Sequence, residues 1–373
     1  MTDKKIEFYP LKDYLKSPKV LSRFNEATIE TFDSGQLING QLVTLFESKF
    51  AKQLASEFCI TVGSGLDALT LSLRALGVKQ GDEVIVPAFT FIATWFCVEG
   101  TLATPVPCDV NEKGLLDLDL CKTIITERTK AVIFVHLFGI ASDLSSFALY
   151  LKELGISLIE DCAQASGAMI NNSSVGTFGD VGCFSFYPTK NLGALGDGGA
   201  VVTSNKGVAE IIRSYKNYGT FDNKYEHINL GVNSRLDAVQ AAWLSRELET
   251  LSESNKRRRE IAERINNSIG ESRLVKTLER DTTSEEDVFH LFVIKCIDER
   301  DSILNLLFES NIGFDIHYPK SIVEQKVYQN RNFNLELYPQ SISLAKSVVS
   351  LPLYPWMDDE TLADLCSRLN SIF

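Results

Sequence analysis

A single lysine, Lys190, lies in the glycine-rich stretch FYPTKNLGALGDGG at 186–199. Ser185 precedes it by five residues, so a hydroxyl and an ammonium group around one turn can converge on one ligand. A lysine in mostly apolar, glycine-lined surroundings has a lowered pKa, and such a lysine is a nucleophile toward carbonyl groups. The alternative is a lysine whose stem follows the surface while its ammonium group reaches water.

A carboxylate, Asp161, ends the otherwise apolar run that leads into IEDCAQA at 159–165. The apolar run indicates a poorly solvated carboxylate, which needs a cation or an N–H donor as its partner. A protonated heterocyclic nitrogen is one such partner. Capping of a following helix is the alternative.

Two more stretches combine a predicted strand end with ligand-binding features. TVGSGLDAL at 61–69 places bare backbone at a helix start, where free N–H groups and the helix dipole attract an anion. The alternative is a plain strand-to-helix turn capped by Ser64. PAFTFIATW at 87–95 offers Phe91 for stacking on a flat ring, against burial in the core as the alternative.

These four features occur in a fixed order along the chain. The anion turn comes first, followed by the aromatic residue, the strand-end carboxylate, and the serine with the lysine. They match the needs of pyridoxal phosphate, which are a phosphate cradle, ring stacking, a partner for the pyridine nitrogen and an amine that traps the aldehyde. The combination therefore predicts a pyridoxal phosphate site.

The elements that must position these residues alternate between apolar strands and helical patterns. FCITV (58–62), EVIVP (83–87) and AVIFV (131–135) are each followed by a helical stretch. This rhythm predicts an α/β fold with a mostly parallel, helix-covered sheet whose ligands bind at the carboxyl ends of the strands. CFSFY (183–187) and AVVTS (200–204) are predicted to flank the lysine loop like the two sides of a hairpin.

The pattern of predicted strands and helices changes near residue 250. We expect a large cofactor-binding domain at 1–250 and a smaller α+β domain at 251–373, with the first residues of the chain packed on the smaller one. The basic run KRRR at 256–259 is interpreted as a solvated helix face.

Composition narrows the classes of partner. The net charge is −12, which disfavours nucleic acid because phosphate backbones demand a basic surface. No apolar run is long enough for a bilayer, and the N-terminus has no signal core. The eight cysteines form no CxxC pair, so we expect buried thiols in a reducing cytoplasm, with neither a disulfide frame nor a metal site.

The sequence resembles the sugar aminotransferases of the DegT/DnrJ/EryC1/StrS family, which are fold-type I pyridoxal phosphate enzymes of the aspartate aminotransferase type. The resemblance covers nearly the whole chain. It is carried by SGQLINGQLVTLFE (34–47), LIEDCAQASGA (158–168), the lysine loop, GVNSRLDAVQAAWL (231–244) and HYP (317–319).

The resemblance implies a role for each matching position. Lys190 is implied to form the Schiff base with the cofactor and to shuttle protons, and Asp161 to pair with the pyridine nitrogen. The other implied cofactor contacts are Gln164 beside the ring, Phe91 stacked on it, and Gly65, Leu66 and Ser185 at the phosphate. Asn233 is implied to reach the phosphate from the other subunit, which implies a homodimer. From the residues alone, Asn233 is a helix cap.

The resemblance also narrows the reaction. It favours amination by L-glutamate at C3 of a dTDP-linked 3-keto-6-deoxyhexose, which would give a dTDP-3-amino-3,6-dideoxyhexose for O-antigen, S-layer or antibiotic sugars. Tyr187 supports C3, because branches acting at C4 more often carry histidine there. The expected substrate contacts are Tyr187, His317 and Tyr318, with Arg213, Lys216 and Arg235 as weaker candidates for the substrate phosphates. C4 amination and a non-catalytic, cofactor-binding regulatory role are the alternatives.

Two positions depart from the family pattern. Leu66 stands where many relatives carry threonine or cysteine, so a backbone N–H is expected to replace the side-chain contact with the phosphate. KSIVEQ (320–325) follows HYP where relatives commonly carry a small residue, proline and histidine.

Overall fold

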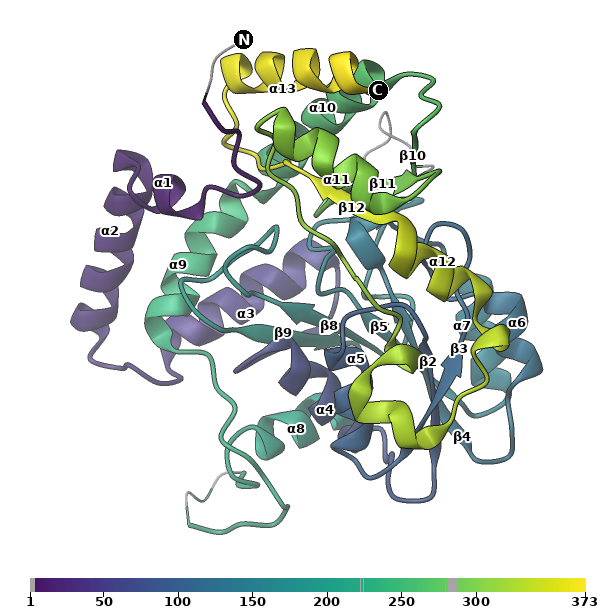
Figure 1. Cartoon of the computed structure of the whole chain (residues 1–373). Helices are drawn as coiled ribbons and strands as arrows, with labels where there is room; N and C mark the ends of the chain where they lie inside the picture. The colour runs from purple at the N-terminus through teal and green to yellow at the C-terminus, as the bar shows by residue number, and fades with distance from the viewer. Residues whose placement is uncertain (1–3, 222, 224, 279, 281–286) are drawn as a thin grey trace.

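The computed structural model describes residues 4–221, 223, 225–278, 280 and 287–373 (Figure 1). The helices are α1 (Leu11–Leu15), α2 (Pro18–Ser34), α3 (Gln41–Leu54), α4 (Gly65–Ala75), α5 (Ala93–Glu99), α6 (Leu118–Thr123), α7 (Ser145–Glu153), α8 (Lys206–Tyr215), α9 (Ala238–Glu249), α10 (Leu251–Ile269), α11 (Arg300–Glu309), α12 (Pro339–Ser347) and α13 (Asp359–Ile372). The strands are β1 (Phe58–Val62), β2 (Glu83–Pro87), β3 (Thr104–Cys108), β4 (Thr129–Val135), β5 (Ser157–Asp161), β6 (Met169–Ile170), β7 (Ser173–Ser174), β8 (Val181–Ser185), β9 (Gly199–Thr203), β10 (Val275–Thr277), β11 (Phe292–Cys296) and β12 (Val348–Leu351).

A seven-stranded sheet forms the centre of the large part of the chain. Its strand order is β1-β9-β8-β5-β4-β2-β3, and only β9 runs antiparallel to its neighbours. The predicted α/β fold with a mostly parallel sheet is confirmed. The hairpin-like flanks of the lysine loop are confirmed as well, since β8 and β9 pair antiparallel.

The sheet is covered on both faces because alternate side chains of each strand point to opposite sides. In β8, Cys183 joins the apolar cluster that contains α4 and α8, whereas Phe184 joins the cluster that contains α3 and α9. Aromatic rings fill the second layer, and Phe50 of α3 meets Phe184 edge to face with ring centroids 5.1 Å apart. Figure 1 shows α3 and α9 together beside β9.

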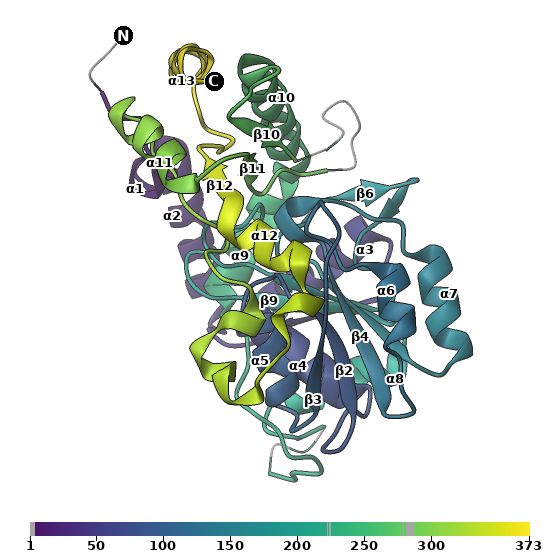
Figure 2. The same cartoon turned by 45° about the vertical axis from the view of Figure 1, so that its right-hand side comes forward.

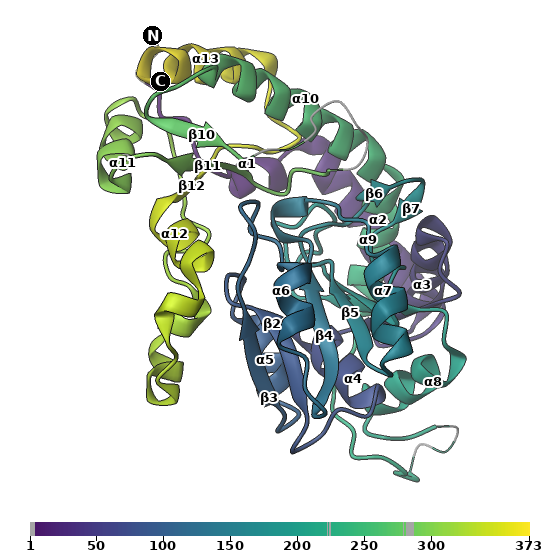
Figure 3. The same ribbon diagram turned by 90° about the vertical axis from the view of Figure 1, so that its right-hand side faces the viewer.

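A second sheet of three antiparallel strands, β10-β11-β12, lies apart from the first with α10, α11 and α13 around it (Figures 2 and 3). It has its own apolar cluster. Ile6 is part of that cluster and pairs with Ile312, so the start of the described chain does pack on this region, as predicted. The division into domains at 1–250 and 251–373 stays a prediction.

The basic run at 256–259 is not a wholly solvated face, and that interpretation was wrong for Arg258. Arg258 is only 2% exposed, and its guanidinium donates to the carbonyls of Phe289, His290 and Leu353. It is buried because α10 packs against α13 and the small sheet rather than facing solvent along its whole length.

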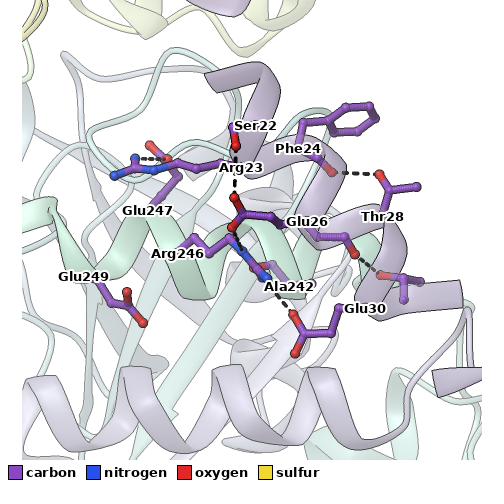
Figure 4. A network of polar contacts seen from close by, with 12 residues as sticks. Ser22, Arg23, Phe24, Glu26, Thr28, Glu30, Ala242, Arg246, Glu247 and Glu249 are labelled. Carbon is purple, nitrogen blue, oxygen red and sulfur yellow. Dashed lines mark hydrogen bonds and ion pairs between the residues drawn. The ribbon is translucent and has the colours of Figure 1, made fainter. Parts of the chain in front are cut away.

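Helix α2 is attached to α9 by a polar network (Figure 4). Arg23 contacts Glu247 at 2.7 Å, and Arg246 contacts Glu30 at 2.8 Å. Tyr14 adds a hydrogen bond to Glu247 at 2.9 Å. Partly exposed ion pairs of this kind contribute up to about 1 kcal/mol each, so the network fixes the placement of α2 more than it stabilises the fold.

The cysteines are free thiols, and all are buried except the half-buried Cys366. The expectation of buried thiols is confirmed for seven of the eight cysteines. Among the described residues, the helices include none with the length and apolar content needed to cross a membrane.

A buried carboxylate, Glu160, organises the loop between β7 and β8. It accepts hydrogen bonds from the backbone N–H groups of Gly176, Phe178 and Gly179, and its Oε2 lies 3.0 Å from His136 Nε2. Glu160 and His136 are both fully buried. Cys162 lies near this pair, but the carboxylate oxygens already have these donors, so the cluster is a structural network and not a free metal site.

Replacing Glu160 with alanine is expected to lower the free energy of unfolding by about 3 kcal/mol, because three backbone N–H groups and an imidazole lose their partner. Urea unfolding followed by circular dichroism measures this. The matched control is Glu153→Ala, at an exposed position on α7, which is expected to unfold like the parent. Equal unfolding midpoints for both variants would contradict this account of Glu160.

Candidate active site

The predicted site residues gather at one edge of the large sheet. Asp161 and Ser185 are the last residues of β5 and β8, and α4 begins at Gly65 just after β1. Strands β1, β5 and β8 run in the same direction, so their carboxyl ends meet at this edge. Lys190 lies in the loop between β8 and β9.

The lysine loop is compact and holds Lys190 in a desolvated place. The N–H of Lys190 donates to the carbonyl of Tyr187 at 2.8 Å. A Cβ at Gly193 would lie 2.5 Å from the carbonyl oxygen of Pro188, so this close turn requires glycine. Burial lowers the pKa of Lys190 to about 8, although the negative charge of Asp161 acts in the opposite direction. The predicted lowering is confirmed.

Asp161 is a buried carboxylate that a bound cation would stabilise. Burial raises its pKa, and hydrogen bonds from Ala163 N–H at 3.1 Å and Thr94 Oγ1 at 3.0 Å offset this only in part. Lys190 and His136 also lower the pKa through their charges. Thr94 was missed by the sequence reasoning, and its only signal was its position three residues after Phe91.

The start of α4 forms a cradle against β8. Ser64 caps the helix, as the alternative interpretation of this turn expects, since Ser64 Oγ accepts the N–H of Asp67 at 3.1 Å. A Cβ at Gly65 would lie 2.8 Å from Cβ of Ser185, so the cradle exists only because this residue is glycine. The first N–H groups of a helix lack partners within the helix, so those of Gly65 and Leu66 are available to an anion.

Gln164, Phe91 and Tyr318 form a second group of site residues. Gln164 Oε1 accepts the N–H of Phe138 at 2.6 Å, and its Nε2 donates to the hydroxyl of Tyr318 at 3.0 Å. The Tyr318 ring lies 5.8 Å from that of Phe91. Phe91 is 55% exposed, so its ring is open to a ligand and is not a core residue.

The expected substrate contacts differ in their surroundings. Tyr187 is exposed. His317 already has a partner within the protein, since its Nδ1 lies 2.9 Å from Ser350 Oγ. Burial lowers the pKa of His317. Lys216 is buried, and its Nζ donates to the carbonyl of Thr61 at 2.6 Å, so it is not free to bind a substrate phosphate.

Asn233 is not a helix cap, which corrects the interpretation from the residues alone. The cap of α9 is Asp237, four residues later. Asn233 is exposed and pairs antiparallel with Asn217. Its side chain is therefore placed on the surface, away from the start of the helix.

One further residue at the site was missed. Asn191, which follows Lys190, donates to Asn255 Oδ1 and to the carbonyl of Val288, both at 2.9 Å. Its Oδ1 lies 3.1 Å from His290 Nδ1. These partners are far away in the sequence, so no local pattern reveals that the lysine loop is braced by residues from α10 and beyond.

A cleft of about 1070 Å³ reaches Lys190 from the side of the N-terminal residues, α10 and residues 354–364. Pro188 and Lys190 line it, whereas Asp161 and Ser185 are not among the lining residues. The side chains with the chemistry of the site thus lie only partly along this cleft.

These observations test whether pyridoxal phosphate fits. The cradle that a Cβ at Gly65 would fill suits a phosphate, the desolvated Asp161 carboxylate suits a protonated pyridine nitrogen, and Lys190 with its lowered pKa suits an aldehyde. The residues fit the cofactor, and the fold and site define a pyridoxal-phosphate-dependent enzyme.

Comparison with known proteins agrees with a pyridoxal-phosphate-dependent enzyme. The profile of the DegT/DnrJ/EryC1/StrS aminotransferase family matches residues 19–370. The dTDP-3-amino-3,6-dideoxy-alpha-D-galactopyranose transaminase of Aneurinibacillus thermoaerophilus is 42% identical over 92% of this chain and 94% of its own. The erythromycin biosynthesis sensory transduction protein EryC1 of Saccharopolyspora erythraea is 40% identical over 94% and 95%. The crystal structure of DesV from S. venezuelae superposes with a TM-score of 0.93 at 34% identity, covering 99% of this chain and 98% of that one.

The chain therefore belongs to the DegT/DnrJ/EryC1/StrS aminotransferase family. It is an aminotransferase that uses pyridoxal phosphate. The family resemblance inferred from the lysine loop and the NSRLD stretch is confirmed.

The lowered pKa of Lys190 predicts how its reactivity depends on pH. Only the neutral amine reacts with an acylating reagent, so in the cofactor-free protein labelling of Lys190 is expected to rise with pH and reach half its maximum near pH 8. In Asp161→Asn the midpoint is expected at lower pH, because the charge that raises the lysine pKa is gone. Peptide mass spectrometry measures the labelling. A midpoint near the ordinary lysine value of about 10.4, in either protein, would contradict the prediction.

Proposed function

We propose that the enzyme transfers the amino group of L-glutamate to C3 of a dTDP-linked 3-keto-6-deoxyhexose. A transaminase named for a dTDP-3-amino-3,6-dideoxyhexose is 42% identical to this chain, which supports a nucleotide-sugar substrate. Tyr187 supports C3, because it replaces the histidine more common in C4 branches. The observation that carries the proposal is the desolvated Lys190, whose pKa burial lowers although the charge of Asp161 acts in the opposite direction.

Each residue has a defined task in this proposal. When bound, pyridoxal phosphate supplies an electron-accepting ring that lets an amino group leave one substrate and reach another. Lys190 Nζ takes up and returns a proton, and a pKa of about 8 leaves a useful share of both protonation states near neutral pH. Asp161 holds a positive charge on the pyridine nitrogen, and Gly65, Leu66 and Ser185 hold the phosphate.

We also propose that the active unit is a homodimer in which Asn233 serves the site of the partner subunit. Asn233 is exposed, and the segment that leads to it carries exposed apolar side chains, including Tyr218, Leu230 and Val232. An apolar surface next to a site residue is typical of a protein–protein contact.

A regulatory protein that binds the cofactor without turnover is the second candidate. The name of the Saccharopolyspora erythraea relative, a sensory transduction protein, favours it. The intact set of Lys190, Asp161 and Asn233 argues against it. C4 amination is the alternative within the same chemistry.

Amination of a panel of 3-keto and 4-keto nucleotide sugars with glutamate tests the proposal, with the product position assigned by NMR. A 3-amino product is expected from the dTDP-linked 3-keto-6-deoxyhexose. A 4-amino product would replace the C3 assignment, and a coloured protein without any amino sugar product would support the regulator.

Lys190→Ala is expected to fold like the parent and to lose turnover by at least about 1000-fold, because no other amine takes its place. The panel assay measures the loss, and circular dichroism checks the fold. Normal amination by this variant would remove Lys190 from its proposed role.

Mixed dimers test the role of Asn233. A dimer of Lys190→Ala and Asn233→Asp subunits has one intact site only if Asn233 acts across the interface. We expect each pure variant to be impaired and activity to return on mixing, measured by glutamate-dependent amination. If the mixture stays as inactive as the pure variants, Asn233 acts within its own subunit.

A further inference from the structure

A buried serine, Ser234, connects the start of α4 with the segment that carries Asn233. Ser234 is 2% exposed. Its hydroxyl donates to Asp67 Oδ2 at 2.7 Å and accepts the N–H of Gly63 at 2.9 Å. Gly63 precedes the phosphate cradle, and Asp67 lies in the first turn of α4. One hydroxyl therefore contacts both sides of the cradle.

The segment around Ser234 is itself held in register. Residues 232–234 pair with 215–218, through hydrogen bonds from Val232 N–H to the carbonyl of Tyr215 at 2.7 Å and from Ser234 N–H to that of Lys216 at 3.0 Å. Lys216 in turn donates to the carbonyl of Thr61 at the end of β1. The segment is thus fixed to the end of β1 at two points, by Ser234 and by Lys216.

The packing around Gly63 leaves little freedom. A Cβ there would lie 2.9 Å from Asp67 Oδ2 and 3.4 Å from Ser234 Oγ. The carboxylate of Asp67 is consequently held against the backbone just before the cradle. The backbone N–H of Asp67 also has a partner, because it donates to Ser64 Oγ.

The hydrogen bond between Ser234 and Asp67 affects how a phosphate would bind at the start of α4. Asp67 places a negative charge in the same helical turn as the N–H groups of Gly65 and Leu66, and like charges repel at short range. A hydroxyl that donates to a carboxylate offsets part of its charge and fixes its position. Without Ser234, the carboxylate would be free to turn toward a bound phosphate.

We propose that Ser234 is a positioning residue for the cofactor phosphate of its own subunit, acting through Asp67 and Gly63, while the adjacent Asn233 serves the partner. Two neighbouring residues then tie together the two phosphate sites of the dimer. The inference rests on the proposed assignment of the phosphate to the start of α4 and of Asn233 to the partner subunit.

The experiment compares pyridoxal phosphate with pyridoxal, which lacks the phosphate. Full-length protein freed of cofactor is titrated with each compound, and binding is followed by absorbance. Ser234→Ala is expected to weaken pyridoxal phosphate binding about tenfold, the usual effect of a lost hydrogen bond to a charged group, and to leave pyridoxal binding within about twofold. Loss of affinity for both compounds, or for neither, would overturn the proposal.

The matched control is Ser245→Ala on α9. Ser245 is also buried, but its hydroxyl has no hydrogen-bond partner among the described residues, so removing it is expected to change neither affinity. If this variant also weakened only pyridoxal phosphate, the effect of Ser234→Ala would not be specific.

A second substitution separates positioning from packing. Asp67→Asn keeps an oxygen acceptor and removes the charge, so alone it is expected to bind pyridoxal phosphate at least as tightly as the parent, even if Ser234→Ala does not fold. In the double variant the loss caused by Ser234→Ala is expected to shrink to about twofold or less, because the repelling charge is absent. An undiminished tenfold loss in the double variant would contradict a role through Asp67.

Ser185→Ala distinguishes a failure of this inference from a failure of the proposed site. If the cradle binds the phosphate, Ser185→Ala also weakens pyridoxal phosphate more than pyridoxal. A phosphate-specific loss in Ser185→Ala but not in Ser234→Ala would overturn the inference alone. No such loss in either variant would overturn the proposed phosphate site as well. Neither outcome depends on turnover of a sugar substrate.

Discussion

The site depends on one electrostatic constraint, the desolvation of two opposite charges at the carboxyl edge of the sheet. Asp161 ends a buried strand and pays a desolvation cost that Thr94 and Ala163 offset only in part. Lys190 is desolvated too, and its pKa falls to about 8. Each group makes the charged form of the other less unfavourable, and neither is fully satisfied. Asp161 therefore suits a cationic ring nitrogen, and Lys190 suits an aldehyde.

The rest of the local structure keeps this edge narrow. The cradle at the start of α4 can approach β8 only because Gly65 has no side chain. The turn after Lys190 closes because Gly193 meets the carbonyl of Pro188. Glu160 uses its carboxylate to hold the loop between β7 and β8. Backbone proximity, and not a large cavity, therefore brings the site residues together.

The polar contacts around the site connect distant parts of the chain. Asn191 joins the lysine loop to Asn255 and His290, and Ser234 joins the start of α4 to the segment that carries Asn233. The site residues are consequently supported from α10 and from the segment before α9. Movement of α10 would shift the loop that carries Lys190, and movement of the segment before α9 would shift the phosphate cradle.

The sequence determined the class of fold, because alternating apolar strands and helices leave few arrangements besides a covered, mostly parallel sheet. It also determined the order of the site residues along the chain. The low pKa of Lys190 depends on its burial in the fold, because the sequence left a lysine that reaches water as the alternative. Only the tertiary structure decided that Arg258 is buried, that Asn233 is no helix cap, and that Thr94, Asn191 and Ser234 support the site. These contacts join positions separated by up to 171 residues, and their energies depend on distance in space, which no local pattern encodes.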